Sequence, residues 1–185
     1  MVTRQPADLL EQIDPARLPP LASWNPPCSG TMDLCIARDG TWYHEGWPIV
    51  RRSLVRLFAT LLRREADGDY YLVTPVEKWR IRVDDVPFRA VALTITGSGR
   101  EQQLDFRTDF GEPVPAGPAH PIEVEYPGPG DEPAPYVQVR DGLRARLTRA
   151  VFLELAERAE QREESGAAVY GVWTRGAFFM LGPAE

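Results

Sequence analysis

Residues 36–40 read Ile-Ala-Arg-Asp-Gly and residues 138–142 read Gln-Val-Arg-Asp-Gly, so the same turn signal occurs twice in one chain. Asp-Gly that follows alternating apolar residues is typical of a β-hairpin. An amphipathic helical pattern follows both copies. Two such copies predict an internal duplication, whereas a solenoid would need three or more repeats.

The pattern around the first copy predicts a hairpin, a helix and further strands. Leu34 and Ile36 alternate before the turn, and residues 41–43 form the return strand. The helix is predicted from apolar residues at helical spacing: Val50, Leu54, Leu57, Phe58, Leu61 and Leu62. Residues 70–73 predict the next strand, and residues 90–107 a second hairpin across Gly97-Ser98-Gly99.

The second copy predicts the same order. Residues 136–139 form a strand, and a helix capped by Thr148 follows the turn. A closing hairpin is predicted from residues 169–173 and 177–181, and Tyr71–Pro75 is echoed by Phe179–Pro183.

These patterns predict an α+β fold of two related small domains, each a mostly antiparallel sheet packed against a helix. We expect an N-terminal helical arm at 1–23, a first domain at 24–112 and a C-terminal domain at 136–185. The Pro/Gly-rich residues 113–135 are interpreted as a connector with an edge strand, or as part of the C-terminal domain.

Composition excludes several classes of protein. With 43% hydrophobic and 26% charged residues, the 185-residue chain can form a core. The net charge of −6 argues against nucleic acid as a partner. No apolar run approaches the roughly 18–20 residues of a membrane span, and the N-terminus lacks the pattern of a signal peptide. We therefore expect a cytoplasmic protein.

Metal and cofactor chemistry has little support in the sequence. Cys28 and Cys35 are the only cysteines, and His44 and His120 the only histidines, which is a poor set of zinc ligands. No phosphate-loop or dinucleotide fingerprint occurs, so no metal and no cofactor is expected. The cysteines are expected to be free, mostly buried thiols.

Several charged residues are candidates for an anion site. Arg51 and Arg52 begin the first helix, where positive charge opposes the helix dipole and an anion would relieve it; pairing with nearby acids is the alternative. Lys78, the only lysine, follows Glu77 on a loop after a strand, where the two form either binding groups or a surface ion pair. Trp24 is either a lid over a pocket or simple packing.

Seven segments together resemble the bacterial domain-of-unknown-function family 1285. They are Trp24-Asn25-Pro26-Pro27, Ile36–Trp42, Arg56-Leu57-Phe58, Tyr71–Lys78, Val83–Phe88, Pro133–Tyr136 and Gly176–Phe179. The resemblance implies two related α+β domains, the second superficially similar to pleckstrin-homology folds. It also implies a ligand-binding cleft between them and a role in signalling, and it names no reaction.

The family motif residues that the resemblance implies for such a cleft are Trp24, Asn25, Arg38, Asp39, Glu77 and Lys78. Cys35, Trp47 and Arg51 depart from the family pattern. The departure at Arg51 argues against it as a shared anion ligand.

The first functional hypothesis is a non-catalytic ligand-binding or sensor protein. In it a small anion lies between the two domains, held by Arg38, Arg52 and Lys78 against Trp24. The second is an enzyme with Glu77 or His44 as acid or base and Lys78 steering an anionic substrate. The third is an adaptor that binds another protein through a sheet edge or a basic helix face. Each of the three hypotheses is compatible with a homo-oligomer.

Overall fold

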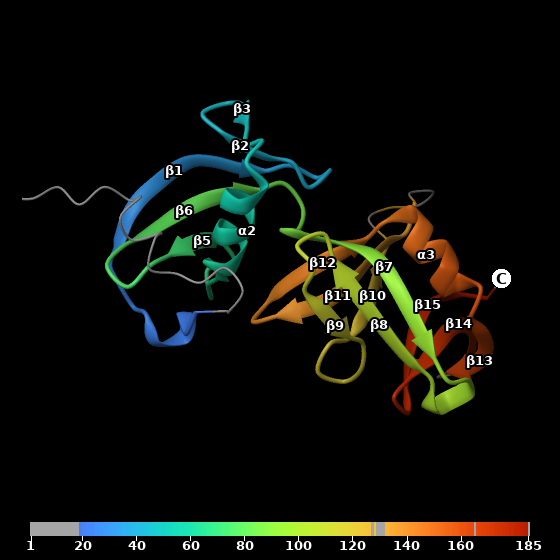
Figure 1. The fold of residues 1–185 in the computed structure, drawn as a ribbon. Helices are drawn as coiled ribbons and strands as arrows, with labels where there is room; N and C mark the ends of the chain where they lie inside the picture. Colours follow the sequence, from blue (N-terminus) through green and yellow to red (C-terminus); the bar gives the residue numbers. More distant parts are fainter. Residues whose placement is uncertain (1–18, 127, 129–131, 165, 185) are drawn as a thin grey trace, which may run out of the picture. The chain divides into compact units, whose positions relative to one another are not determined.

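The computed structural model describes residues 19–126, 128, 132–164 and 166–184. The chain divides into two compact units, Met1–Pro87 and Phe88–Glu185 (Figure 1). The predicted first domain runs to residue 112, whereas this division falls after Pro87. Most of the predicted helical arm lies outside the described residues, and its described end is the 3-10 turn η1, Leu21–Ser23.

From residue 19 onward, where the structure describes it, the first unit has one six-stranded sheet and one α-helix. Its strands follow the spatial order β3-β2-β1-β6-β5-β4, in which β1 and β6 are parallel and all other neighbours antiparallel. The elements are β1 (Cys28–Ile36), β2 (Trp42–His44), β3 (Trp47–Pro48), α2 (Arg52–Thr60), β4 (Leu62–Arg64), β5 (Tyr70–Val73) and β6 (Lys78–Val83).

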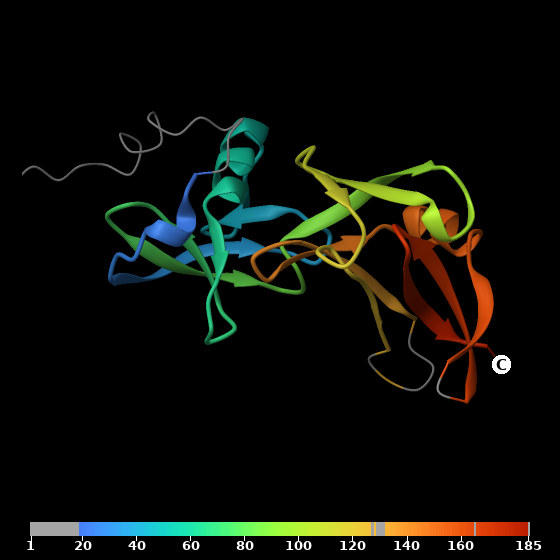
Figure 2. The same cartoon turned by 90° about the horizontal axis from the view of Figure 1, so that it is seen from below.

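Helix α2 covers one face of this sheet (Figures 1 and 2). The Phe58 ring of α2 stacks on Trp42 of β2 with ring centroids 6.3 Å apart, and Trp42 is only 2% exposed. Leu72 and Ile81 are buried, and Ile81 lies between the exposed Arg80 and Arg82 of β6. Successive strand residues point to opposite faces, so the second face of β4, β5 and β6 carries cationic side chains together with the buried Tyr71 and Val73.

The predicted helix runs past the observed one. Val50, at its predicted start, is 88% exposed, and α2 ends at Thr60. Leu62 instead opens strand β4, where it pairs with Leu72. A buried strand and the last turn of an amphipathic helix both require apolar residues here, so periodicity alone does not separate them.

The second unit has two sheets. The six-stranded sheet has the order β10-β11-β12-β7-β8-β9, and the three-stranded sheet the order β13-β14-β15. The elements are β7 (Phe88–Thr96), η2 (Gly99–Glu101), β8 (Gln103–Thr108), β9 (Pro113–Pro115), β10 (Ile122–Glu125), β11 (Ala134–Arg140), β12 (Leu143–Leu147), α3 (Arg149–Ala156), β13 (Glu160–Glu164), β14 (Ala167–Thr174) and β15 (Ala177–Pro183).

The turn between β14 and β15 joins the two sheets of this unit. Thr174 is fully buried, and its hydroxyl donates to the carbonyl of Ala116 at 3.0 Å and accepts from the N–H of Leu104 at 3.2 Å. Arg175 Nη1 donates to the carbonyls of Leu104 and Ala116 at 3.3 and 2.9 Å, and its Nη2 pairs with Asp105 at 2.6 Å. Polar side chains thus hold the β14–β15 hairpin against β8 and its neighbours.

Both units contain a hairpin, a helix and a three-strand meander in the same order, which agrees with the predicted α+β duplication. In the first unit the meander is β4-β5-β6, and β6 pairs with β1 to give one sheet. In the second unit β12 pairs instead with β7, in parallel, and β13-β14-β15 form a sheet of their own.

Candidate functional site

The face of the first sheet that α2 leaves open carries a row of charged side chains from β4 and β6. Register places Arg63 opposite Tyr71, Tyr71 opposite Arg80, and Lys78 opposite Val73. Arg82 follows two residues after Arg80 and therefore points the same way. We call Arg63, Tyr71, Lys78, Arg80 and Arg82 the charged sheet face.

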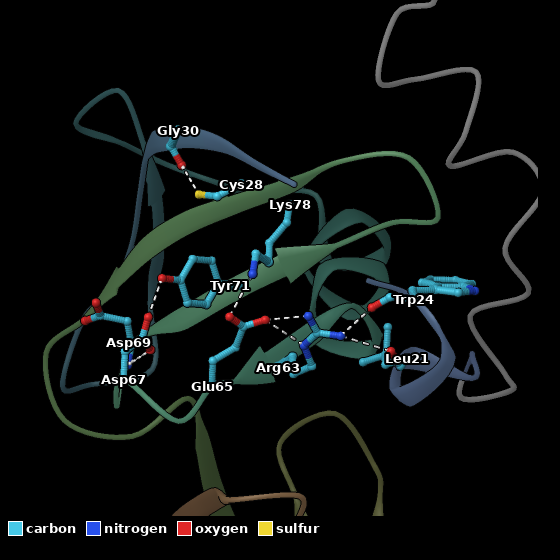
Figure 3. A network of polar contacts seen from close by, with 10 residues as sticks. All are labelled: Leu21, Trp24, Cys28, Gly30, Arg63, Glu65, Asp67, Asp69, Tyr71 and Lys78. Carbon is cyan, nitrogen blue, oxygen red and sulfur yellow. Dashed lines mark hydrogen bonds and ion pairs between the residues drawn. The ribbon is translucent and has the colours of Figure 1, made fainter. Parts of the chain in front are cut away.

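At one end of this face, Arg63 and Lys78 form a triad with Glu65, which follows β4 in the chain (Figure 3). In this triad two cations share one carboxylate, and all three side chains are half-buried. The ammonium of Lys78 donates to Glu65 Oε2 at 2.7 Å. The guanidinium of Arg63 donates to Glu65 Oε1 from Nε at 3.1 Å and also from Nη2. The side chains of Lys78, Arg63 and Glu65 are 15%, 16% and 23% exposed.

Arg63 also holds the segment that precedes β1. Its Nη1 donates to the carbonyl of Trp24 at 2.6 Å and to that of Leu21 at 3.1 Å. These two carbonyls lie at the ends of η1, which Figure 3 shows beside the triad. The contacts connect Trp24 to Lys78 through Arg63 and Glu65.

The pKa of Glu65 reflects its two partners. Burial would raise the pKa of this carboxyl, but hydrogen bonds from Lys78 and Arg63 outweigh burial and hold the pKa below its ordinary value of 4.5. Glu65 is therefore a carboxylate at neutral pH.

Tyr71 separates the triad from a second group of charges. Its hydroxyl donates to Asp67 at 2.7 Å, and this hydrogen bond raises the pKa of Tyr71 to about 12 and lowers the pKa of Asp67. The ammonium of Lys78 lies 4.8 Å from the centre of the Tyr71 ring, a cation–π contact. Asp69 pairs with Arg80 on the far side.

The charge balance differs between the two ends. The triad contains two cations and one carboxylate, and so carries one net positive charge. The group beyond Tyr71 contains Arg80 with Asp67 and Asp69, and so carries one net negative charge. The end next to Trp24 is therefore the more positive end of the face.

A shallow hollow of about 330 Å³ lies farther along the face, lined by Thr31, Asp69, Arg80 and Arg82 among others. Arg82 pairs with Asp84 at 3.3 Å and also donates to Cys35 Sγ at 3.1 and 3.2 Å. Both guanidinium groups here have acidic partners and are exposed, so solvent screens their charges more than it screens the charges of the triad.

Of the residues predicted for a site, the structure brings Trp24 and Lys78 into one network. Asn25 is exposed beside Trp24. Glu77 is half-buried, and its main chain closes the loop before β6: its N–H donates to the hydroxyl of Thr74 at 3.2 Å, and its carbonyl accepts from that hydroxyl at 3.1 Å.

Arg38, Asp39 and Arg52 lie elsewhere in the first unit. Arg38 and Asp39 are exposed in the turn after β1, where the Asp39 carboxylate accepts from the N–H of Thr41 at 2.8 Å. That turn follows the end of β1 that pairs with Val83, about 16 Å along β6 from Lys78. Arg52 is exposed at the start of α2.

Sequence reasoning missed Arg63, Glu65 and Tyr71. The helix predicted through Leu62 hides the strand β4, to which Arg63 belongs. No helical or strand periodicity is visible in the segment Leu62–Glu65. Only the pairing of β4 with β5 places Arg63 beside Tyr71.

Other features of the described chain bear on the remaining predictions. Cys35 is buried and Cys28 exposed, and both are free thiols. Within the described ranges, no three His, Cys, Asp or Glu side chains gather in a way that suits a metal ion. The helices in those ranges are too short and too polar to cross a bilayer.

Comparison with known proteins identifies relatives along almost the whole chain. Residues 19–86 match the "Domain of unknown function (DUF1285), N-terminal domain", and residues 87–181 match the "Protein of unknown function (DUF1285), C-terminal domain". A crystal structure of a DUF1285 family protein from Silicibacter pomeroyi is 44% identical, covers 95% of this chain and 93% of that one, and has a TM-score of 0.87.

A second crystal structure, of a DUF1285 family protein from Shewanella baltica, is 25% identical with a TM-score of 0.53. It covers 68% of this chain and 91% of that one. No protein with a curated description matches the chain. The boundary between the two matched domains falls beside Pro87, where the chain divides into its two units.

Proposed function

This chain belongs to the DUF1285 family, and from that premise we propose that it is a ligand-binding protein whose first unit binds a small anion at the Arg63–Glu65–Lys78 triad. The observation that supports this proposal is that one carboxylate serves two cations whose side chains are 15–16% exposed. A partly buried positive charge in excess is stabilised by an added anion.

Electrostatics gives the scale of the effect. A unit anion about 4 Å from one uncompensated unit charge gains about 4 kcal/mol at the effective dielectric constant near a protein surface, before the cost of desolvation. The group of charges beyond Tyr71 has a net negative charge and repels an anion, so we expect the anion at the end of the charged sheet face next to Trp24. There the exposed Asn25 offers an amide donor, and Glu77 adjoins Lys78 in the chain.

The same contacts support a sensor role. Arg63 binds both Glu65 and the carbonyls of Leu21 and Trp24. An anion that competes with Glu65 for Arg63 therefore alters the hydrogen bonds that Arg63 donates to the segment before β1. A ligand changes a conformational equilibrium only through such differential contacts.

The test is titration of the full chain with phosphate, pyrophosphate and citrate, followed by tryptophan fluorescence and calorimetry, with Trp24→Phe to assign the signal. Lys78→Met is expected to weaken binding at least about tenfold, the loss of one charge-assisted hydrogen bond. Glu65→Gln is expected to tighten it, because the competing carboxylate is removed.

Arg56→Met is the matched control, since Arg56 is an exposed cation on α2, outside the charged sheet face. It should bind like the unmodified chain. The proposal fails if none of the three anions binds, or if Lys78→Met binds them with unchanged affinity. Retained circular dichroism confirms that each variant is folded, and every titration is run well below the melting temperature of the variant used.

A further inference from the structure

We propose that the second unit holds a separate binding site, for a compact amphiphilic anion, in a cavity between the start of α3 and the segment before β11. The cavity has a volume of about 300 Å³, and its lining includes Pro133, Pro135, Arg146, Arg149, Phe152 and Leu153. It lies wholly within the second unit and shares no residue with the triad.

One side of this cavity is apolar for a reason found in α3. Val151 and Leu155 point into the core and are 3% and 0% exposed. Phe152 and Leu153 point elsewhere, to the cavity, and Leu153 is 55% exposed. The buried stripe of Val151 and Leu155 already anchors α3 to the core, so the exposed part of this second apolar pair adds no stability to the fold. An apolar ligand that covers the pair removes its surface from water, which favours binding.

Cations lie next to that apolar pair. Arg149 is three and four residues before Phe152 and Leu153, so all three share one side of the helix. Arg146 reaches the cavity from β12, where its Nη1 lies 3.5 Å from the Tyr136 hydroxyl and its guanidinium 5.7 Å from the Tyr136 ring centre. These contacts hold Arg146 in position before a ligand arrives.

The chemistry of the lining defines the class of ligand. Two guanidinium groups, those of Arg146 and Arg149, line the cavity, and Glu132 is the acidic residue among its described lining. Guanidinium groups recognise carboxylate, sulfonate and phosphate oxygens. The volume is at the lower end of the range for ligand cavities, roughly 300–1,000 Å³, so it favours one or two rings or a short acyl chain over a long lipid tail.

The test uses two fluorescent probes of nearly the same shape on the full chain. 1-Anilinonaphthalene-8-sulfonate is anionic, and N-phenyl-1-naphthylamine is its neutral counterpart. Arg149→Met is expected to weaken the anionic probe about tenfold and to leave the neutral probe unchanged, because only the charge-assisted contact is lost. Leu153→Ser is expected to weaken both probes. Benzoate or octanoate should displace the anionic probe from the unmodified chain.

Arg158→Met is the matched control, because Arg158 is an exposed arginine just after α3 and outside the cavity lining. It should behave like the unmodified chain, as should Lys78→Met, which affects only the triad. Equal binding of the anionic probe by Arg149→Met and the unmodified chain overturns the proposal. So does loss of that binding in Lys78→Met. Because both substituted cavity residues are exposed, the variants are expected to fold, and circular dichroism checks this.

Discussion

At the scale of single residues, Glu65 has the largest influence on the triad. Two cations contact it, and one of them, Arg63, also fixes the main chain at Leu21 and Trp24. Its carboxylate therefore links the end of β4 to Lys78 of β6 and, through Arg63, to η1. If the triad binds an anion as we propose, that anion competes with Glu65 for Arg63 and Lys78, and stability and ligand affinity oppose each other at this position.

Glu65 also predicts how stability depends on pH. Because the pKa of Glu65 in the folded chain lies below 4.5, the folded state holds its proton more weakly than the unfolded state. The stabilisation is therefore fully present above the unfolded pKa and is lost as pH falls through the folded pKa. Glu65→Gln should lower the free energy of unfolding by about 1–2 kcal/mol near pH 7.

The measurement is urea unfolding from about pH 7 down to about pH 3. The gap between the unmodified chain and Glu65→Gln is expected to close toward the acid end. A gap that stays constant over this range would show that the charge of Glu65 contributes nothing to folding.

At the scale of elements, sequence repeats do not specify identical turns. In the first copy Ala37 pairs with Thr41, and Gly40 has a φ of 86°, which is a three-residue loop closed by a left-handed glycine. In the second copy Arg140 pairs directly with Leu143, and both Asp141 and Gly142 have positive φ, which is a two-residue turn. One extra residue in the first loop is enough to change the register of the hairpin.

The β14–β15 hairpin depends on one close approach. A Cβ at Gly171 would lie 2.3 Å from the Phe178 ring and 2.6 Å from the carbonyl oxygen of Phe179. Since the second of these atoms is main chain, the strands themselves would have to move. Gly171→Ala is expected to lower the free energy of unfolding by about 1–3 kcal/mol, measured in urea.

Gly117→Ala is the control for this substitution. There the nearest atom to a new Cβ is Arg175 Cδ at 3.6 Å, an ordinary contact, so stability should stay nearly unchanged. Equal effects of the two substitutions would contradict the packing argument.

At the scale of the whole molecule, all the strands of each sheet come from a single unit. The six strands of the first sheet all lie before Pro87, and every strand of the other two sheets lies after it. The predicted first domain, residues 24–112, includes the hairpin β7–β8. In the structure this hairpin lies in the second unit, because β7 pairs in parallel with β12. No local sequence pattern indicates that pairing.

Division of the chain tests this assignment. Residues 1–87 and 88–185, produced separately, are each expected to show the circular dichroism of a folded protein and cooperative urea unfolding. A cut after residue 112 should instead leave a C-terminal piece that does not fold, because β7 and β8 supply Phe88, Ala90, Leu104 and Phe106 to its core, each at most 1% exposed. Folding of residues 113–185 alone would contradict the assignment.

The sequence by itself determined the α+β class, the duplicated order of elements and the family. These follow from local signals: alternation, helical spacing, turn residues and short motifs. Only the tertiary structure decided the end of α2, the partner of β7 and the joining of Arg63 and Glu65 to Lys78. The physical reason is that strand pairing brings together residues that are distant in sequence, and side chains meet only after the register is set.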